Sequence, residues 1–237
     1  MLAEQRGSFG TDISNVWIVV PAYNEADRIA RTVTSLTSSF SNVIVVDDGS
    51  RDGTFDSICQ LPVWALRHPI NLGQGAALQT GIDFAMRHGA EIVVTFDADG
   101  QHDAQDIERL IEPISSARAD VSLGSRFLGK EAVNMPASRK IILKLGVLFT
   151  RIFSQIQVTD THNGLRAFSR SAASQIRITQ NRMAHASEIL DQIQYLGLRF
   201  EEVPVTVHYC EMVLEKGQQN SAAVKVAAQF LLGRIVR

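Results

Sequence analysis

Short apolar runs rich in β-branched residues recur along the first half of the chain and constrain its fold more than any other feature. The runs occupy residues 16–20, 43–46, 63–66, 92–96 and 121–123. They are apolar throughout instead of alternating with polar residues, as is typical of strands buried on both faces of a sheet. Segments with helical periodicity separate them at 25–38, 73–88 and 104–117. The sequence therefore predicts an α/β fold with a mostly parallel central sheet flanked by helices.

The pattern changes after Pro136 to longer amphipathic segments. We expect helices over 138–157, 184–196 and 221–237, and short strands over 165–168 and 203–207. At roughly 100 to 200 residues per domain, a chain of 237 residues holds one large domain or two small ones. Because no long linker or internal repeat interrupts it, we predict one domain over 1–210. A flexible loop and an amphipathic helix are expected to follow over 211–237.

Composition excludes several classes of protein. The formal net charge of −2 argues against a general nucleic-acid binder, whose affinity depends on many neutralised phosphates. The two cysteines, Cys59 and Cys210, lie far apart, which favours a reducing, cytoplasmic compartment over a disulfide framework. The first fifteen residues have no apolar core typical of a secretory signal. No apolar stretch approaches the ~18 residues of a membrane-spanning helix, so we expect any membrane contact to be peripheral.

Polar turns follow the first, second and fourth predicted strands. Ligands of such sheets bind beyond the carboxyl ends of the strands, where these turns meet. Asp48, after the second strand, could accept a hydrogen bond from a nucleotide base or ribose. The alternative is that Asp48, Ser50 and Asp52 cap a helix, since these residue types favour helix starts.

The fourth strand ends in two carboxylates, Asp97 and Asp99, followed by Gln101. Mg²⁺ and Mn²⁺ prefer oxygen ligands and share them between protein and substrate phosphates. A capped loop before the next helix is the structural alternative. The chain has no G-x-G-x-x-G after its first strand and no P-loop motif, so a dinucleotide oxidoreductase or a P-loop kinase is not indicated.

Four motifs carry a family resemblance. They are VPAYNE at 20–25, VDDGSRDG at 46–53, NLGQGA at 71–76 with Gly81, and DADGQ at 97–101. Their order and spacing resemble those of family 2 glycosyltransferases of the GT-A fold, and especially the branch with dolichyl-phosphate mannose synthase and bacterial polyprenyl-phosphate glycosyltransferases. The resemblance is strong over 16–126 and looser to about residue 207.

The resemblance implies a donor site for a UDP- or GDP-linked sugar. The donor-binding residues that it implies are Pro21, Tyr23, Glu25, Asp48, Asn71, Asp97 and Lys216. Asp97, Asp99 and Gln101 would bind Mg²⁺ or Mn²⁺ against the diphosphate, and Asp99 is also expected to be catalytic. For Asn71, Gly73 and Gly81, packing beneath the donor is the alternative. For Lys216, the alternative is that its polar loop, which contains Gly217, has no functional role.

The resemblance also implies residues for the acceptor. Arg126, in a Gly-Ser-Arg turn, would contact an acceptor phosphate, and Arg139 and Arg166 could add to this contact. Asp160 and Glu188 are the candidate catalytic bases for a hydroxyl acceptor, whereas a phosphate acceptor is already ionised and needs none. A solvated face for Arg139 and a structural ion pair for Asp160 with Arg166 are the alternatives.

The function implied is inverting, metal-dependent transfer of a sugar to a polyprenyl phosphate. The runner-up acceptor is a saccharide hydroxyl on a cell-surface glycan, and a more distant alternative is a non-catalytic sugar-nucleotide binding module. The helices at 138–157 and 221–237 resemble surface-lying membrane helices. The alternative is that these two helices cover the sheet or form a homo-oligomer contact. We expect a cytoplasmic protein that binds reversibly to the inner face of the membrane.

Overall fold

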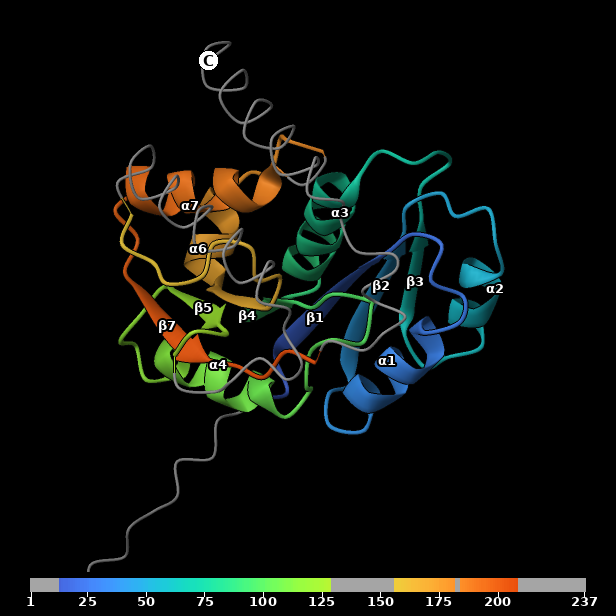
Figure 1. Ribbon diagram of the computed structural model, residues 1–237, viewed down its shortest axis with the longest axis horizontal. Helices are drawn as coiled ribbons and strands as arrows, with labels where there is room; N and C mark the ends of the chain where they lie inside the picture. The colour runs from blue at the N-terminus through green and yellow to red at the C-terminus, as the bar shows by residue number, and fades with distance from the viewer. Residues whose placement is uncertain (1–12, 129–155, 182–183, 209–237) are drawn as a thin grey trace, which may run out of the picture.

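Strand β1 (Val16–Ala22) lies inside a seven-stranded sheet, and all seven of its residues are buried. The computed structural model describes residues 13–128, 156–181 and 184–208 (Figure 1). The other strands are β2 (Asn42–Asp47), β3 (Trp64–Arg67), β4 (Ile92–Thr95), β5 (Val121–Ser125), β6 (Arg166–Ser169) and β7 (Phe200–Pro204). The uniform burial of β1 confirms that its unbroken apolar run marks a strand covered on both faces.

The strand order is β3-β2-β1-β4-β6-β5-β7. Every neighbouring pair is parallel except those of β6, which runs antiparallel to both β4 and β5. The sheet is therefore mostly parallel, as predicted. Insertion of β6 brings the segment before Arg166 beside the carboxyl end of β4, because Thr95 pairs with Arg166.

Helices cover both faces of the sheet (Figure 1). They are α1 (Ile29–Thr37), α2 (Thr54–Cys59), α3 (Gln74–Arg87), α4 (Asp106–Ser115), α6 (Arg170–Gln175) and α7 (His185–Tyr195). Ile18 and Val20 of β1 pack in one hydrophobic cluster with residues of α1, α2 and α4. Trp17 and Val19 pack in a second cluster with residues of α3, α6 and α7. The alternation along β1 thus divides the core into two layers.

The predicted elements differ from the observed ones mainly at their ends. The helix predicted from residue 25 begins at Ile29, because Asn24 adopts a positive φ of 54° and residues 25–28 form a turn. The last strand lies at Phe200–Pro204 instead of 203–207, since Phe200 pairs with Val121 of β5. Helices α2 and α6 were not predicted. Six residues each are too few to show a helical period.

Part of the prediction falls on residues that the structure does not describe. The expected helix at 138–157 lies almost entirely outside the described residues, and the loop and helix at 211–237 lie wholly outside them. Among the helices of the described ranges, none combines the length and apolar character needed to cross a bilayer.

The packing of α3 on β1 depends on Gly81. A Cβ atom built on Gly81 would lie 2.2 Å from Val19 Cγ1. We predict that Gly81→Ala lowers the free energy of unfolding by about 1–3 kcal/mol, because overpacking forces the helix away from the strand. Urea denaturation measures this change. The double variant Gly81→Ala with Val19→Ala should recover part of the loss, and a double variant no more stable than Gly81→Ala alone would contradict this explanation.

Candidate active site

The turns after β1 and β2 are tied together by hydrogen bonds between backbone and side chains. The Asn24 backbone N–H donates to Ser50 Oγ at 2.9 Å, and the Glu25 N–H donates to Thr54 Oγ1 at 2.9 Å. In return, the Arg51 N–H donates to Asn24 Oδ1 at 3.0 Å. These bonds join segments more than 25 residues apart in the sequence, so the two turns form one fixed edge.

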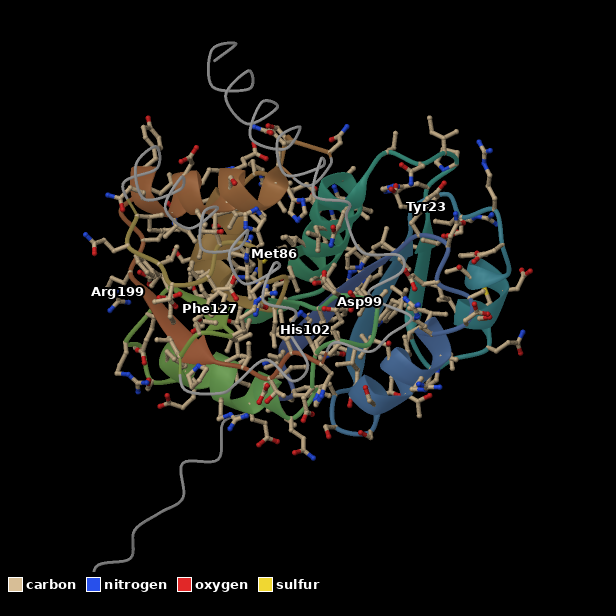
Figure 2. The ribbon with its side chains drawn as sticks, in the orientation of Figure 1. Tyr23, Met86, Asp99, His102, Phe127 and Arg199 are labelled. Atoms are coloured by element: carbon tan, nitrogen blue, oxygen red, sulfur yellow. The ribbon has the colours of Figure 1, made fainter. Side chains whose placement is uncertain are left out.

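The predicted donor residues of the described chain lie along this edge. Pro21 is buried in β1 opposite Val46 of β2. Tyr23 is 42% exposed, and Figure 2 shows it toward the β3 side of the molecule, with Asp99 nearer the middle. Glu25 is half-buried and Asn71 is exposed. The edge therefore presents one aromatic side chain and several polar groups to the surface.

Asp48 lies buried beneath the same edge, and its carboxylate is engaged within the protein. It accepts hydrogen bonds from His68 Nδ1 at 2.7 Å, from the Leu72 N–H at 3.0 Å and from the Gly73 N–H at 2.7 Å. The helix-capping alternative does not describe this arrangement, because these donors belong to His68 and to the loop between β3 and α3.

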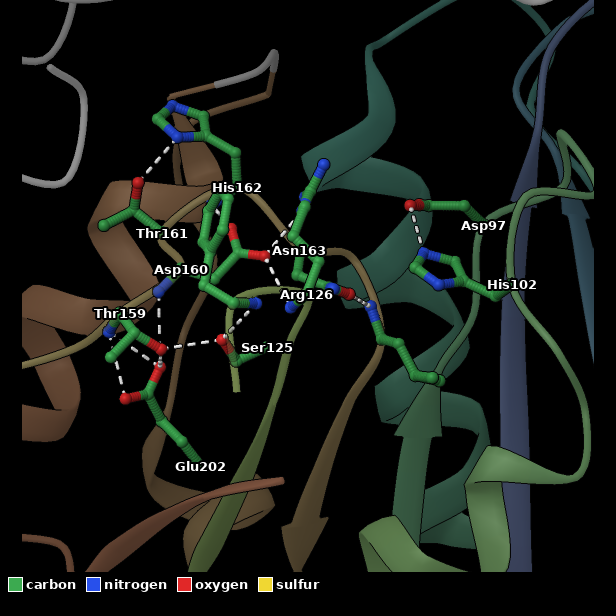
Figure 3. A network of polar contacts seen from close by, with 12 residues as sticks. Asp97, His102, Ser125, Arg126, Thr159, Asp160, Thr161, His162, Asn163 and Glu202 are labelled. Carbon is green, nitrogen blue, oxygen red and sulfur yellow. Dashed lines mark hydrogen bonds and ion pairs between the residues drawn. The ribbon is translucent and has the colours of Figure 1, made fainter. Parts of the chain in front are cut away.

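Asp97 follows β4 and is surrounded by donors and cations from other segments. Gln74 Nε2, in the first turn of α3, donates to Asp97 Oδ1 at 3.0 Å, and His102 Nε2 lies 3.4 Å from Asp97 Oδ2 (Figure 3). Burial raises the pKa of Asp97, but the hydrogen bond from His102 and the electrostatic interactions with His102, His185 and Arg166 outweigh it. The pKa of Asp97 therefore lies below its usual value, and its carboxylate is ionised at neutral pH.

Gly164 comes into close contact with the Asp97 carboxylate. A Cβ atom at this position would lie 2.1 Å from Asp97 Oδ2. The Gly164 carbonyl oxygen also accepts a hydrogen bond from Thr95 Oγ1 at 2.7 Å. Only a residue without a side chain fits between this segment and Asp97.

Asp99 has the opposite electrostatic environment. Burial and the neighbouring charge of Asp97 both raise its pKa. One of its oxygens, Oδ1, accepts a hydrogen bond from the Gln101 N–H at 3.0 Å. Within the described residues, no group of three or more His, Cys, Asp or Glu side chains is placed to hold a metal ion. The two aspartates thus form a pair whose like charges are not fully balanced.

Arg126, just after β5, forms a buried ion pair with Asp160. Its Nε atom lies 2.6 Å from Asp160 Oδ2, and the two residues are 7% and 4% exposed (Figure 3). Glu202 of β7 fixes the neighbouring backbone, because its carboxylate accepts from the Thr159 N–H at 2.8 Å and from the Asp160 N–H at 3.3 Å. The Asp160 carboxylate is therefore held toward Arg126.

Arg166 is a second buried cation. It donates to the carbonyl oxygens of Asn163 at 3.1 Å and of Thr161 at 3.2 Å. Burial lowers the pKa of Arg166 to about 10, and the charges of Asp97 and Asp160 oppose this shift. Arg166 thus stays protonated at neutral pH and is electrostatically coupled to both aspartates.

Glu188, in the first turn of α7, is buried and engaged. Its carboxylate accepts from the Thr179 hydroxyl at 2.5 Å, from the Thr179 N–H at 3.0 Å and from the Gln180 N–H at 2.9 Å. These bonds anchor the loop before α7. That loop contacts the start of α3, where the Gly75 N–H donates to the Asn181 carbonyl oxygen at 2.9 Å.

Comparison with known proteins identifies the family. A family model described as "Glycosyl transferase family 2" matches residues 17–177. The chain belongs to glycosyltransferase family 2. It is 34% identical over 239 residues to the UDP-N-acetylglucosamine–dolichyl-phosphate N-acetylglucosaminyltransferase of Methanococcus voltae, covering 92% of this chain and 95% of the relative. It is 33% identical to the undecaprenyl-phosphate mannosyltransferase of Micrococcus luteus, covering 81% and 82%.

The solved structures agree with the GT-A fold. Glucosyl-3-phosphoglycerate synthase from Mycobacterium tuberculosis, crystallised with Mn²⁺, UDP and glucosyl-3-phosphoglycerate, superimposes with a TM-score of 0.72 and 17% identity, covering 92% of this chain and 77% of that one. At this identity the likeness concerns the fold alone. The predicted family and fold are both confirmed, and this family 2 glycosyltransferase is an enzyme instead of a non-catalytic binding module.

The structure brings only some of the predicted site residues of this glycosyltransferase together. Asp97, Arg166 and Asp160 form one electrostatic group, whereas Glu188 and Asp48 are engaged with loops. The predicted residues Arg139 and Lys216 lie outside the described residues.

Sequence reasoning assigned no role to several residues that shape the site. They are Gln74, His102, Gly164, His68 and Glu202. A signal existed for three of them. His102 directly follows the DADGQ motif, His68 follows a strand, and Gln74 lies inside a motif already recognised. Nothing local marked Glu202, whose partners lie 42 and 43 residues away.

The close contact between Gly164 and Asp97 leads to a prediction for this transferase. Gly164→Ala should reduce the rate of sugar transfer roughly 100-fold, because displacing a catalytic group by about 1 Å has effects of that size. Steady-state kinetics with purified protein measure the change. Gly53→Ala is the control, since a Cβ at Gly53 would meet only Ala26 Cβ at 4.0 Å. Full activity of Gly164→Ala would show that Asp97 does not need its observed position.

Proposed function

We propose that this enzyme transfers a sugar, with inversion, from a UDP- or GDP-linked donor to a polyprenyl phosphate. The two relatives named above carry dolichyl-phosphate and undecaprenyl-phosphate in their names, and the chain covers most of each. A polyprenyl acceptor has a lipid tail, so the reaction takes place at a membrane surface. We infer peripheral binding at its cytoplasmic face, to which the segments at 138–157 and 221–237 would contribute.

The donor occupies the edge formed by the turns after β1, β2 and β3. Tyr23 supplies an exposed aromatic surface beside the two polar turns that the hydrogen bond between Asn24 and Ser50 joins. Pro21, Glu25 and Asn71 complete the nucleoside side of this site in the proposal. We assign Asp48 to the nucleoside side as well, because its carboxylate accepts hydrogen bonds from the loop before α3.

Asp97 and Asp99, with Gln101, fit a site for Mg²⁺ or Mn²⁺. Burial, and after it the negative charge of Asp97, raise the pKa of Asp99, and a bound divalent cation would stabilise the ionised form of both carboxylates. Within the described residues, no third acidic or histidine side chain joins these two carboxylates, an arrangement that suits an ion sharing its coordination with phosphate oxygens and water. When bound, such an ion offsets the charge that develops on the leaving diphosphate. Gln74 and His102 hold Asp97 in place for this contact.

The engagement of the two candidate bases is the observation that carries the choice of acceptor. Asp160 Oδ2 is paired with Arg126 Nε, and both oxygens of Glu188 accept hydrogen bonds from the loop at residues 179–180. A hydroxyl acceptor must lose a proton to a base, whereas a phosphate acceptor is already ionised. The buried guanidinium of Arg126 suits a phosphate oxygen. Arg166 and Arg139 are the further acceptor residues of the proposal.

The proposal predicts a specific pattern of acceptor use. Radiolabelled UDP- and GDP-sugars should label polyprenyl phosphate in the presence of Mg²⁺ or Mn²⁺. The free polyprenol should be labelled roughly 100-fold more slowly or not at all, because a site built for a charged group rejects an analogue that lacks it. A chelator should abolish transfer, and added metal should restore it. Labelling of an oligosaccharide but not of polyprenyl phosphate would overturn the proposal in favour of a hydroxyl acceptor.

The variant Glu188→Gln is a second test of whether the acceptor is a phosphate or a hydroxyl group. The glutamine amide can keep its oxygen toward the Thr179 and Gln180 N–H groups and place its NH2 against the Thr179 hydroxyl, so the variant loses the negative charge that strengthens these bonds. We predict a loss of about 1–3 kcal/mol in the free energy of unfolding, with kcat of the folded protein within about threefold of wild type. Urea denaturation and kinetics below the melting temperature test this. A fall in kcat of several orders of magnitude with unchanged stability would identify Glu188 as a base.

A further inference from the structure

A buried pair, Asp48 and His68, lies behind the donor edge and has no part in the chemistry described so far. Asp48 begins the turn after β2, and His68 directly follows β3. The Asp48 and His68 side chains are 3% and 10% exposed, and Asp48 Oδ1 lies 2.7 Å from His68 Nδ1. Because an ionised carboxylate can only accept, His68 Nδ1 is the donor in this bond.

Both oxygens of Asp48 face the loop before α3. Oδ1 accepts from the Leu72 N–H at 3.0 Å in addition to His68, and Oδ2 accepts from the Gly73 N–H at 2.7 Å. Three donors thus converge on one buried side chain.

The apolar side chains of the loop do little to hold it in place. Ile70 is 63% exposed and Leu72 is 41% exposed, so burial of these apolar side chains does not fix the backbone. The hydrogen bonds from Leu72 and Gly73 to Asp48 take that role. Without them, the loop would be free to rearrange toward conformations that cover its apolar side chains.

His68 extends the same network into α3. Its Nε2 atom lies 3.0 Å from Thr80 Oγ1, two turns into the helix. The first residue of α3, Gln74, donates to Asp97 Oδ1. The start of α3 is therefore held from one side by the Asp48–His68 pair and contacts the proposed metal carboxylate on the other.

We propose that Asp48 and His68 act together as positioning residues for the donor, holding the 70–73 loop and the start of α3. The proposal rests on the proposed function, in which this edge binds a nucleoside diphosphate sugar. It goes beyond any contact of Asp48 with the donor, because it makes His68 as important for donor binding as Asp48.

The test compares His68→Asn with His68→Leu. These side chains have nearly the same size and shape, but only asparagine offers an N–H donor near the position of His68 Nδ1. His88→Gln is the control, because His88 is an exposed histidine at the opposite end of α3. Hydrogen exchange at the Leu72 and Gly73 amides reports on the loop without any ligand. Titration calorimetry with UDP and GDP, each with Mn²⁺, reports on donor binding.

We expect His68→Leu to speed exchange at Leu72 and Gly73 and to weaken nucleotide binding, each by about tenfold, the size of one lost hydrogen bond to a charged group. The KM for the donor sugar should rise by a similar factor. His68→Asn should retain most of the slow exchange and most of the nucleotide affinity of the wild type, and His88→Gln should change neither quantity. Thermal melting identifies any variant with global destabilisation, and the Asn variant keeps the test valid if the Leu variant does not fold.

Asp48→Asn completes the experiment. If both residues act through the loop, combining Asp48→Asn with His68→Leu should weaken binding no further than the stronger single variant. The proposal is overturned if His68→Leu leaves exchange and nucleotide affinity unchanged. It is also overturned if Asp48→Asn weakens nucleotide binding without speeding exchange at Leu72 and Gly73. If the wild-type protein binds neither nucleotide, the proposed function itself fails, and the donor role of the pair fails with it.

Discussion

The carboxylate of Asp97 is held where four segments of the chain meet, and the rest of the site is arranged around it. A partly buried negative charge is costly unless donors and cations surround it. Gln74 comes from α3, His102 from the loop after β4 and Arg166 from β6, while Gly164 allows the backbone to approach. The antiparallel insertion of β6 beside β4 brings Arg166 and the neighbouring Gly164 to Asp97.

The two halves of the site are built in different ways. On the donor side, the turns after β1, β2 and β3 are held by hydrogen bonds between side chains and backbone, such as those of Ser50 and Asp48. On the proposed acceptor side, Arg126 is ion-paired with Asp160, and the buried Arg166 interacts electrostatically with Asp97 and Asp160. A set of backbone bonds gives a fixed edge for a nucleoside. Buried guanidinium groups give an electrostatic attraction for phosphate.

The sequence predicted the fold well, because its strands follow from local patterns. Unbroken apolar runs identified five strands of the parallel sheet, and the spacing of Asp97 and Asp99 identified a loop with two adjacent acids. The sequence was less informative about which acids are free to react. Glu188 was a candidate base, yet its carboxylate anchors a loop through Thr179 and Gln180. This difference arises from contacts between segments, and residue type does not reveal them.

The sequence by itself thus determined the class of fold, the family and the chemical types of group at the sheet edge. Periodicity and motif spacing are properties of residues that lie close together in the sequence. The type of each strand or turn can therefore be predicted almost independently of the rest of the chain. Only the tertiary structure decided the partner of each charged group, such as His68 for Asp48 and Arg126 for Asp160. These pairings join residues 20 and 34 positions apart, and they follow from strand order and helix packing, which act over the whole sheet.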